Sequence, residues 1–199
     1  MKNLILGFAI AAVTLTACNN SSDSGNNTTK KQDESSRMAA DPAKSPDTTA
    51  MAGANTEGSM KEMVGQYLQM KNALANDDGK GAAAAGNAFV ASMGKMDKTT
   101  LTGNKLKSWN DLSDDAKEMA EHIGKNADRL EHQREHFEML SGDMYDMVKA
   151  FGGGMVLYKD FCPMYGDKGA FWLSEIKEIK NPYFGKQMPT CGSVKEEIK

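Results

Sequence analysis

Apolar side chains recur every seven residues between positions 130 and 151, and this spacing constrains the fold more than any other feature. Because a helix has about 3.6 residues per turn, such a repeat forms one apolar stripe that must be buried against other elements. The glycine run at 152–154 ends the pattern. The stripe consists of Leu130, Phe137, Leu140, Met144, Met147, Val148 and Phe151.

Three further segments show helical spacing. The first begins near Ser59 and ends at N-D-D-G (76–79), and the second begins at Asp78 with a stripe rich in small residues. Ser113 is expected to cap the third helix, and Asp128 with Glu131 resembles a capping box for the fourth. Four amphipathic helices with short connections predict an all-α fold, an antiparallel up-and-down four-helix bundle over residues 58–152.

The C-terminal residues 153–199 differ in character from the helical part. M-V-L-Y-K-D-F (155–161) and A-F-W-L-S (170–174) are short and apolar, which favours extended segments, while N-P-Y-F-G (181–185) is typical of a turn. This stretch is too small to enclose a core of its own. We expect an irregular, β-containing cap that packs on the bundle.

The N-terminus is typical of an exported lipoprotein. Lys2 precedes an apolar run, and L-T-A-C at 15–18 resembles a lipobox, which predicts a signal peptide at 1–17 and a lipid on Cys18. The alternative is an ordinary signal peptide with a coincidental cysteine. Residues 18–57 are almost devoid of large apolar side chains, which favours a disordered tether. We expect the protein at the periplasmic face of the outer membrane.

Charge and motif content exclude several functions. The chain carries 24 basic and 27 acidic residues without a basic stripe, which argues against nucleic acid as a partner. The sequence contains no phosphate-binding glycine loop and no C-x-x-C motif, and no nucleophile can be paired with a base. We therefore expect a protein that is not an enzyme.

Four ordered motifs identify a resemblance to a bacterial family. They are C-P-M at 162–164, G-A-F-W-L-S at 169–174, N-P-Y-F-G at 181–185 and M-P-T-C-G at 188–192. They resemble a domain of unknown function that occurs in free lipoproteins and in periplasmic adaptor subunits of copper/silver-type efflux pumps. The likeness covers roughly residues 60–199 and departs from the family pattern at Tyr165 and Pro189. The resemblance implies heavy-metal handling, with an efflux adaptor as a candidate partner.

Cys162 and Cys191 allow two interpretations. A disulfide between them would close a loop of about 30 residues and contribute roughly 3–4 kcal/mol, with no metal bound. Alternatively, the two thiolates and the thioethers of Met164 and Met188 would form a soft site for Cu(I), with Ag(I) as a close substitute. The residues alone leave both interpretations open.

Among the histidines His122, His132 and His136, the last two are one helical turn apart, a spacing able to hold a metal. The simpler interpretation is that they are solvated or pack against a neighbouring helix. If the cap covers this helix, His136 joins the sulfur ligands and a Cys2His2 zinc site results. Arg134, near the apolar stripe, is expected to tie the helix to the cap. We predict a lipoprotein that binds a soft metal ion, Cu(I) first, for buffering or delivery to efflux; the alternative is a disulfide-stapled interaction module.

Overall fold

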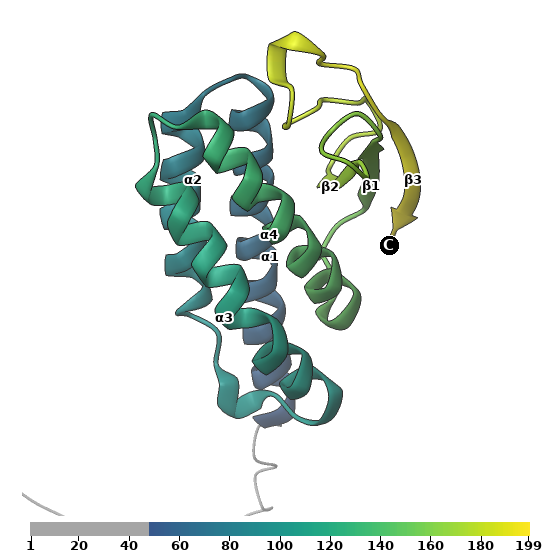
Figure 1. Ribbon diagram of the computed structural model, residues 1–199. Helices are drawn as coiled ribbons and strands as arrows, with labels where there is room; N and C mark the ends of the chain where they lie inside the picture. Colours follow the sequence, from purple (N-terminus) through teal and green to yellow (C-terminus); the bar gives the residue numbers. More distant parts are fainter. Residues whose placement is uncertain (1–47) are drawn as a thin grey trace, which may run out of the picture. The chain divides into compact units, whose positions relative to one another are not determined.

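The computed structural model describes residues 48–199 as four helices followed by a small three-stranded sheet (Figure 1). The predicted signal peptide, Cys18 and most of the predicted tether lie outside the described residues. Within residues 48–199, none of the helices combines the length and apolar character that a bilayer crossing requires. The helices are α1 (Thr48–Ala75), α2 (Gly79–Met93), α3 (Gly103–Lys125) and α4 (Leu130–Phe151), with a short 3-10 turn η1 (Lys98–Thr100) before α3.

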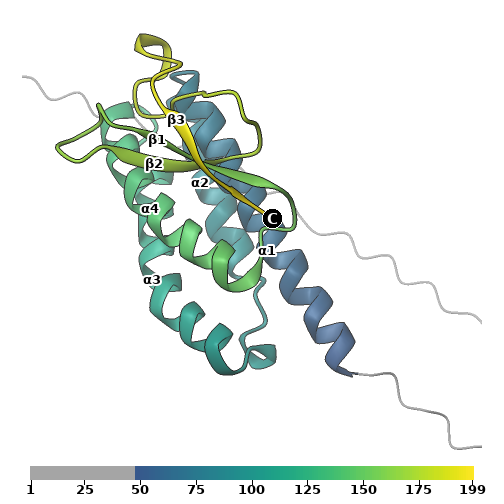
Figure 2. The same cartoon turned by 90° about the vertical axis from the view of Figure 1, so that its right-hand side faces the viewer.

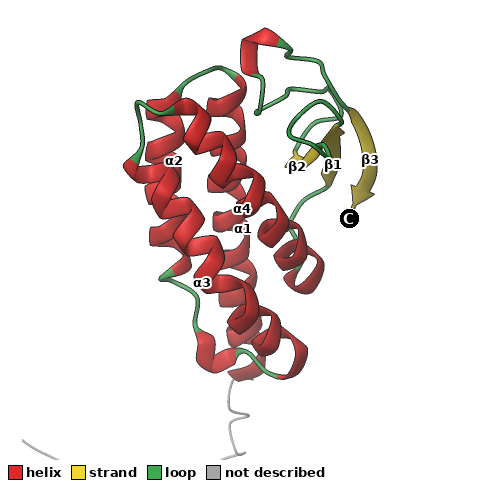
Figure 3. Cartoon of the chain, viewed as in Figure 1, coloured by secondary structure: helices red, strands yellow, loops and turns green. Residues whose placement is uncertain are grey.

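The four helices pack as an antiparallel bundle, which confirms the predicted fold class (Figure 3). Helices that are consecutive in the chain pack against each other, and α4 closes the bundle against α1. Tyr67 of α1 stacks on Phe137 of α4 with ring centroids 4.9 Å apart, and Trp109 of α3 meets Phe151 edge-on. The apolar stripe predicted for α4 therefore lies in the core.

The helix starts differ from the sequence predictions. α1 begins at Thr48, earlier than the predicted bundle boundary at residue 58. α3 begins at Gly103, so Ser113 is buried inside the helix and does not cap it. The helical turns that precede Ser113 contain Trp109, and burial of this large apolar side chain in the core favours the longer helix. The capping box predicted for α4 was also wrong, because the helix starts after Arg129 with no side-chain cap.

The start of α2 and its small-residue stripe agree with the sequence. The Asp78 side chain accepts a hydrogen bond from the backbone N–H of Gly81, as an N-cap residue does. On the stripe, a Cβ placed on Gly86 would lie only 2.8 Å from the carbonyl oxygen of Ala120 in α3. Glycine therefore allows α2 and α3 to approach closely.

The C-terminal sheet packs on the bundle mainly through β2, which contacts α4 and α1 (Figure 2). Its strands are β1 (Leu157–Cys162), β2 (Ala170–Ser174) and β3 (Ser193–Ile198), in the antiparallel order β2-β1-β3. β1 and β2 confirm the two predicted extended segments. β3 was not predicted, because its sequence S-V-K-E-E-I is polar and it forms an exposed edge of the sheet.

Arg134 ties the bundle to the cap, as its position near the apolar stripe predicted. Its Nε donates to the carbonyl of Pro182 at 2.9 Å, and its Nη2 donates to the carbonyl of Leu74 at 3.2 Å and to Asp77 Oδ1 at 2.6 Å. A second buried cation, Lys71, donates to Glu175 Oε2 at 2.7 Å. Buried polar contacts therefore fix the cap on the helices.

Candidate metal centre

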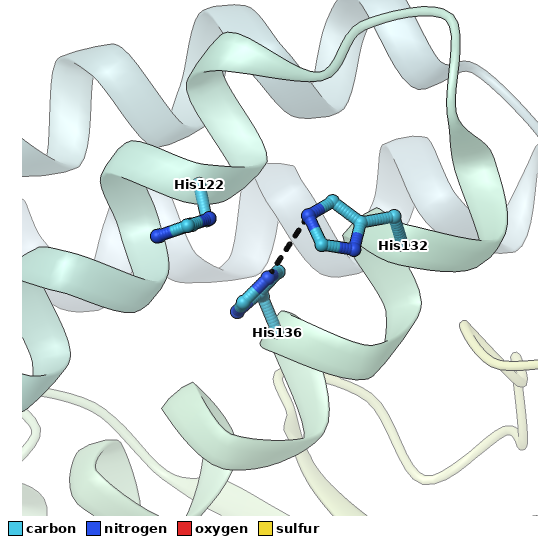
Figure 4. A group of neighbouring side chains, drawn as sticks. All are labelled: His122, His132 and His136. Carbon is cyan, nitrogen blue, oxygen red and sulfur yellow. Dashed lines mark hydrogen bonds between the residues drawn. The ribbon is translucent and has the colours of Figure 1, made fainter.

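Three histidines converge where α3 and α4 face each other (Figure 4). His122 lies near the C-terminal end of α3, and His132 and His136 lie one turn apart at the start of α4. One ring nitrogen of each histidine can be chosen so that all three atoms lie within 4.8 Å of one another. The antiparallel α3–α4 pair brings together residues that the sequence separates.

The spacing of the rings is close to that of metal ligands. His132 Nε2 and His136 Nε2 lie 3.1 Å apart. In a tetrahedral site with metal–nitrogen distances of about 2.0–2.1 Å, two imidazole nitrogens are separated by about 3.3 Å. The His122 ring stacks on His136 with centroids 4.4 Å apart. The His132–His136 pair therefore has nearly the spacing of metal ligands, and His122 would have to turn out of its stack on His136 to complete the set.

The remaining nitrogen of each ring faces an electron-rich atom. His132 Nδ1 lies 3.4 Å from Glu135 Oε2, and His136 Nδ1 lies 3.3 Å from the Met119 sulfur. His122 Nε2 lies 3.9 Å from a Glu118 carboxylate oxygen. A proton on each of these nitrogens leaves the opposite nitrogen with a free lone pair, and outer carboxylates orient metal-binding histidines in this way. In the metal-free protein the Nε2 atoms of His132 and His136 share a hydrogen bond, so one of them carries a proton that a bound metal would displace.

The triad is accessible to solvent, and the pKa of His136 is lowered. The side chains of His122 and His132 are 44% and 25% exposed, so ions can enter from solvent. Burial lowers the pKa of His136, and the neighbouring His122 and His132 lower it further. Three rings this close cannot all be protonated cheaply, because their positive charges repel. His136 is therefore neutral near pH 7, the form that binds metals.

The structure divides the predicted ligands into two groups. His132 and His136 join His122, and no group of three His, Cys, Asp or Glu ligand atoms within residues 48–199 includes a cysteine. Cys162 and Cys191 are free thiols that lie close to each other in the cap. Of the predicted thioether ligands, Met164 is 62% exposed and Met188 is half-buried. The sulfur pair and the histidines are two separate sites.

His122 was the ligand that sequence reasoning did not assign. It lies three residues before the end of α3, and His132 lies two residues after the start of α4. In two antiparallel helices joined by a short loop, residues equally distant from the loop lie side by side. Once the loop at 126–129 is located, the similar distances of His122 and His132 from that loop predict that the two side chains lie close together.

Comparison with known proteins identifies a family for the helical part alone. Residues 63–155 match a family described as protein of unknown function (DUF3347). The match confirms a domain-of-unknown-function family; it contains all three histidines of the triad and ends before Cys162. No curated protein and no solved structure matches the chain.

Proposed function

We propose that this protein, whose residues 63–155 match the DUF3347 family, binds a transition-metal ion at the triad of His122, His132 and His136. The observation that carries the proposal is the convergence of three imidazoles from two helices within 4.8 Å. Acceptors behind each ring and the lowered pKa of His136 support it. Three protein nitrogens leave further coordination positions for water or a partner's ligand.

Copper is the first candidate for the metal. Imidazole is a ligand for copper, zinc, nickel and iron, and the divalent series places Cu(II) above Zn(II) in affinity. The Met119 sulfur lies at Nδ1 of His136, so it supports the ring from behind and is not itself a ligand in this arrangement. Zn(II) is the main competitor, because three histidines with an open fourth position also form a common zinc arrangement.

The proposed setting is an exported, lipid-anchored protein at the periplasmic face of the outer membrane. The lipobox-like L-T-A-C ending at Cys18 and the resemblance to modules of heavy-metal efflux adaptors support this setting. The proposed role is to buffer the metal or deliver it to an efflux system, by binding and without catalysis. An exposed site from which the metal can be transferred fits such a role.

A metal titration of the full chain tests the proposal. We expect one Cu(II) or Cu(I) per chain, with Zn(II) bound more weakly, and a loss of affinity of at least about 100-fold in His132→Ala and in His122→Ala. The Cys162→Ser, Cys191→Ser double variant is the control and should keep this binding. Unchanged affinity in the histidine variants, with circular dichroism showing an intact fold, would contradict the proposal.

A second pair of variants tests the tautomer argument. Glu135→Gln weakens the acceptor behind His132, and we expect a roughly 10-fold loss of metal affinity. Glu131→Gln, one turn earlier on α4, is the matched control, because Glu131 makes no ion pair in the part of the chain that the structure describes. Equal affinities for the two variants would show that the carboxylate does not orient the ring.

A further inference from the structure

Two cysteines far apart in sequence meet at one end of the sheet. Cys162 is the last residue of β1 and is completely buried, whereas Cys191 lies two residues before β3 and is half-buried. β1 and β3 are antiparallel, and Phe161 pairs with Ser193. This register brings the backbone at 162 next to the backbone at 191–192.

A turn held by hydrogen bonds and close contacts places Cys191 beside Cys162. Gly192 has a φ of +141°, and a Cβ there would lie 3.0 Å from the Trp172 ring and 3.1 Å from the carbonyl oxygen of Phe161. Asn181 holds the same loop, since its Nδ2 donates to the carbonyl of Cys191 at 2.7 Å and its backbone N–H donates to the carbonyl of Pro189 at 2.9 Å. The position of Cys191 is therefore fixed by its surroundings.

The thiols are in direct contact, and their chemistry differs from that of a catalytic cysteine. A hydrogen bond with the Cys162 thiol raises the pKa of Cys191, and burial raises it further. Catalytic and redox-enzyme cysteines have lowered pKa values, because the thiolate is the nucleophile. The raised pKa of Cys191 therefore argues for a structural cysteine pair and against a catalytic thiol.

We propose that Cys162 and Cys191 form a disulfide when the protein meets a disulfide oxidant, and that Cys191 reacts first. The Cys191 thiolate attacks the oxidant, forms a mixed disulfide and releases one thiol. The Cys162 sulfur, as thiolate, then attacks the Cys191 sulfur, and the second oxidant sulfur leaves as a thiol. The protein loses two thiol hydrogens, and the two electrons reduce the oxidant.

The order of attack follows from the different burial of the sulfurs. Only Cys191 is accessible to a dissolved oxidant, while the buried Cys162 can reach only Cys191. The bond would close the loop that contains β2 and the turn at Asn181. This inference is independent of metal binding at the triad, because the histidines lie in the other site.

Oxidised glutathione, applied to the full chain under native conditions, tests the order. Mass spectrometry of proteolytic peptides measures the modification of Cys162 and of Cys191 separately from that of Cys18. In the wild-type protein we expect Cys162 and Cys191 to lose two hydrogens together. The Cys162→Ser variant should hold one glutathione on Cys191. In the Cys191→Ser variant, Cys162 should stay unmodified until denaturant is added. Glutathione on Cys162 in the folded Cys191→Ser variant would overturn the order. Retention of both wild-type thiols, with the fold intact, would overturn the disulfide.

Thermal unfolding and metal analysis complete the test. Closing a loop of about 30 residues should raise the Tm of the oxidised protein by roughly 7–14 °C over the reduced protein, a shift absent from the double serine variant. Equal Tm values for oxidised and reduced protein would show that the bond does not stabilise the cap. A Cu(I) ion held by the pair, and lost in the double serine variant, would assign the pair to metal binding instead.

Discussion

The Asp160 side chain is fully buried between the sheet and α1, and neither carboxylate oxygen has a hydrogen-bond partner within residues 48–199. Burial raises its pKa to about 7; the nearby charge of Lys71 opposes the rise, and that of Glu175 adds to it. The carboxyl group is therefore half-protonated near neutral pH, which makes Asp160 a source of pH-dependent stability.

The sign of that dependence can be predicted. Between pH 3.8 and about 7 the folded protein binds more protons at Asp160 than the unfolded chain does, so the free energy of unfolding falls as pH rises. From about pH 5 to about pH 8, we expect Asp160 to account for a loss of roughly 2–3 kcal/mol. Urea unfolding should show that Asp160→Asn removes this loss and that the exposed control Asp167→Asn retains it.

At the proposed metal site, protons and metal would compete for the same imidazoles. The three rings must be deprotonated to bind a metal, and an ordinary histidine has a pKa of about 6.5. We expect the affinity for Zn(II) to fall roughly 10- to 100-fold from about pH 7.5 to about pH 5.5. Because its pKa is lowered, His136 should protonate only below the pH at which an ordinary histidine does. A pH-independent affinity, measured by competition with a chelator, would contradict binding through the triad.

At the scale of elements, one side chain joins α4, the end of α1 and the cap. Arg134→Lys cannot reproduce the contacts with Leu74, Asp77 and Pro182, because lysine lacks the forked guanidinium. We expect a loss of roughly 2–4 kcal/mol in the free energy of unfolding. The exposed Arg129→Lys is the control and should change stability by less than about 0.5 kcal/mol. Denaturant unfolding measures both variants.

Alanine substitutions at two helical glycines, Gly86 and Gly142, are expected to change the free energy of unfolding in opposite directions. Gly86→Ala places a methyl group 2.8 Å from the Ala120 carbonyl, and we expect a cost of roughly 1–3 kcal/mol. Gly142→Ala, inside α4, meets no atom within 4 Å and should stabilise the protein by about 0.5–1 kcal/mol. Thermal unfolding of the two variants should shift Tm in opposite directions.

Elements whose residues show a local pattern, such as an apolar stripe or a capping residue, could be predicted from the sequence. The stripe on α4, the Asp78 cap and the segments that became β1 and β2 were all readable from nearby residues. The strand β3 was not, because its polar sequence forms a strand only through pairing with β1. The triad was half predicted: His132 and His136 share one helix, but His122 reaches them only through packing of α3 on α4.

At the scale of the whole molecule, a bound metal would add a link between α3 and α4, which already pack together and share the hydrogen bond from Gln133 to the carbonyl of Ile123. Because it binds the folded state alone, free metal at about 100 times Kd adds about 2.7 kcal/mol to stability. We expect Tm to rise by roughly 5–10 °C with copper. The rise should be absent from His122→Ala, which leaves both α4 ligands in place but removes the link to α3. A full rise in that variant would show that the metal sits elsewhere.

The bundle also acts as a spacer. The first turns of α4 lie level with the far end of α1, because Gln133 donates to the carbonyl of Gly79 and Arg134 donates to that of Leu74 (Figure 1). α1 is 28 residues long, which corresponds to about 40 Å. The triad therefore stands a full helix length from Thr48, the point where the chain enters the bundle.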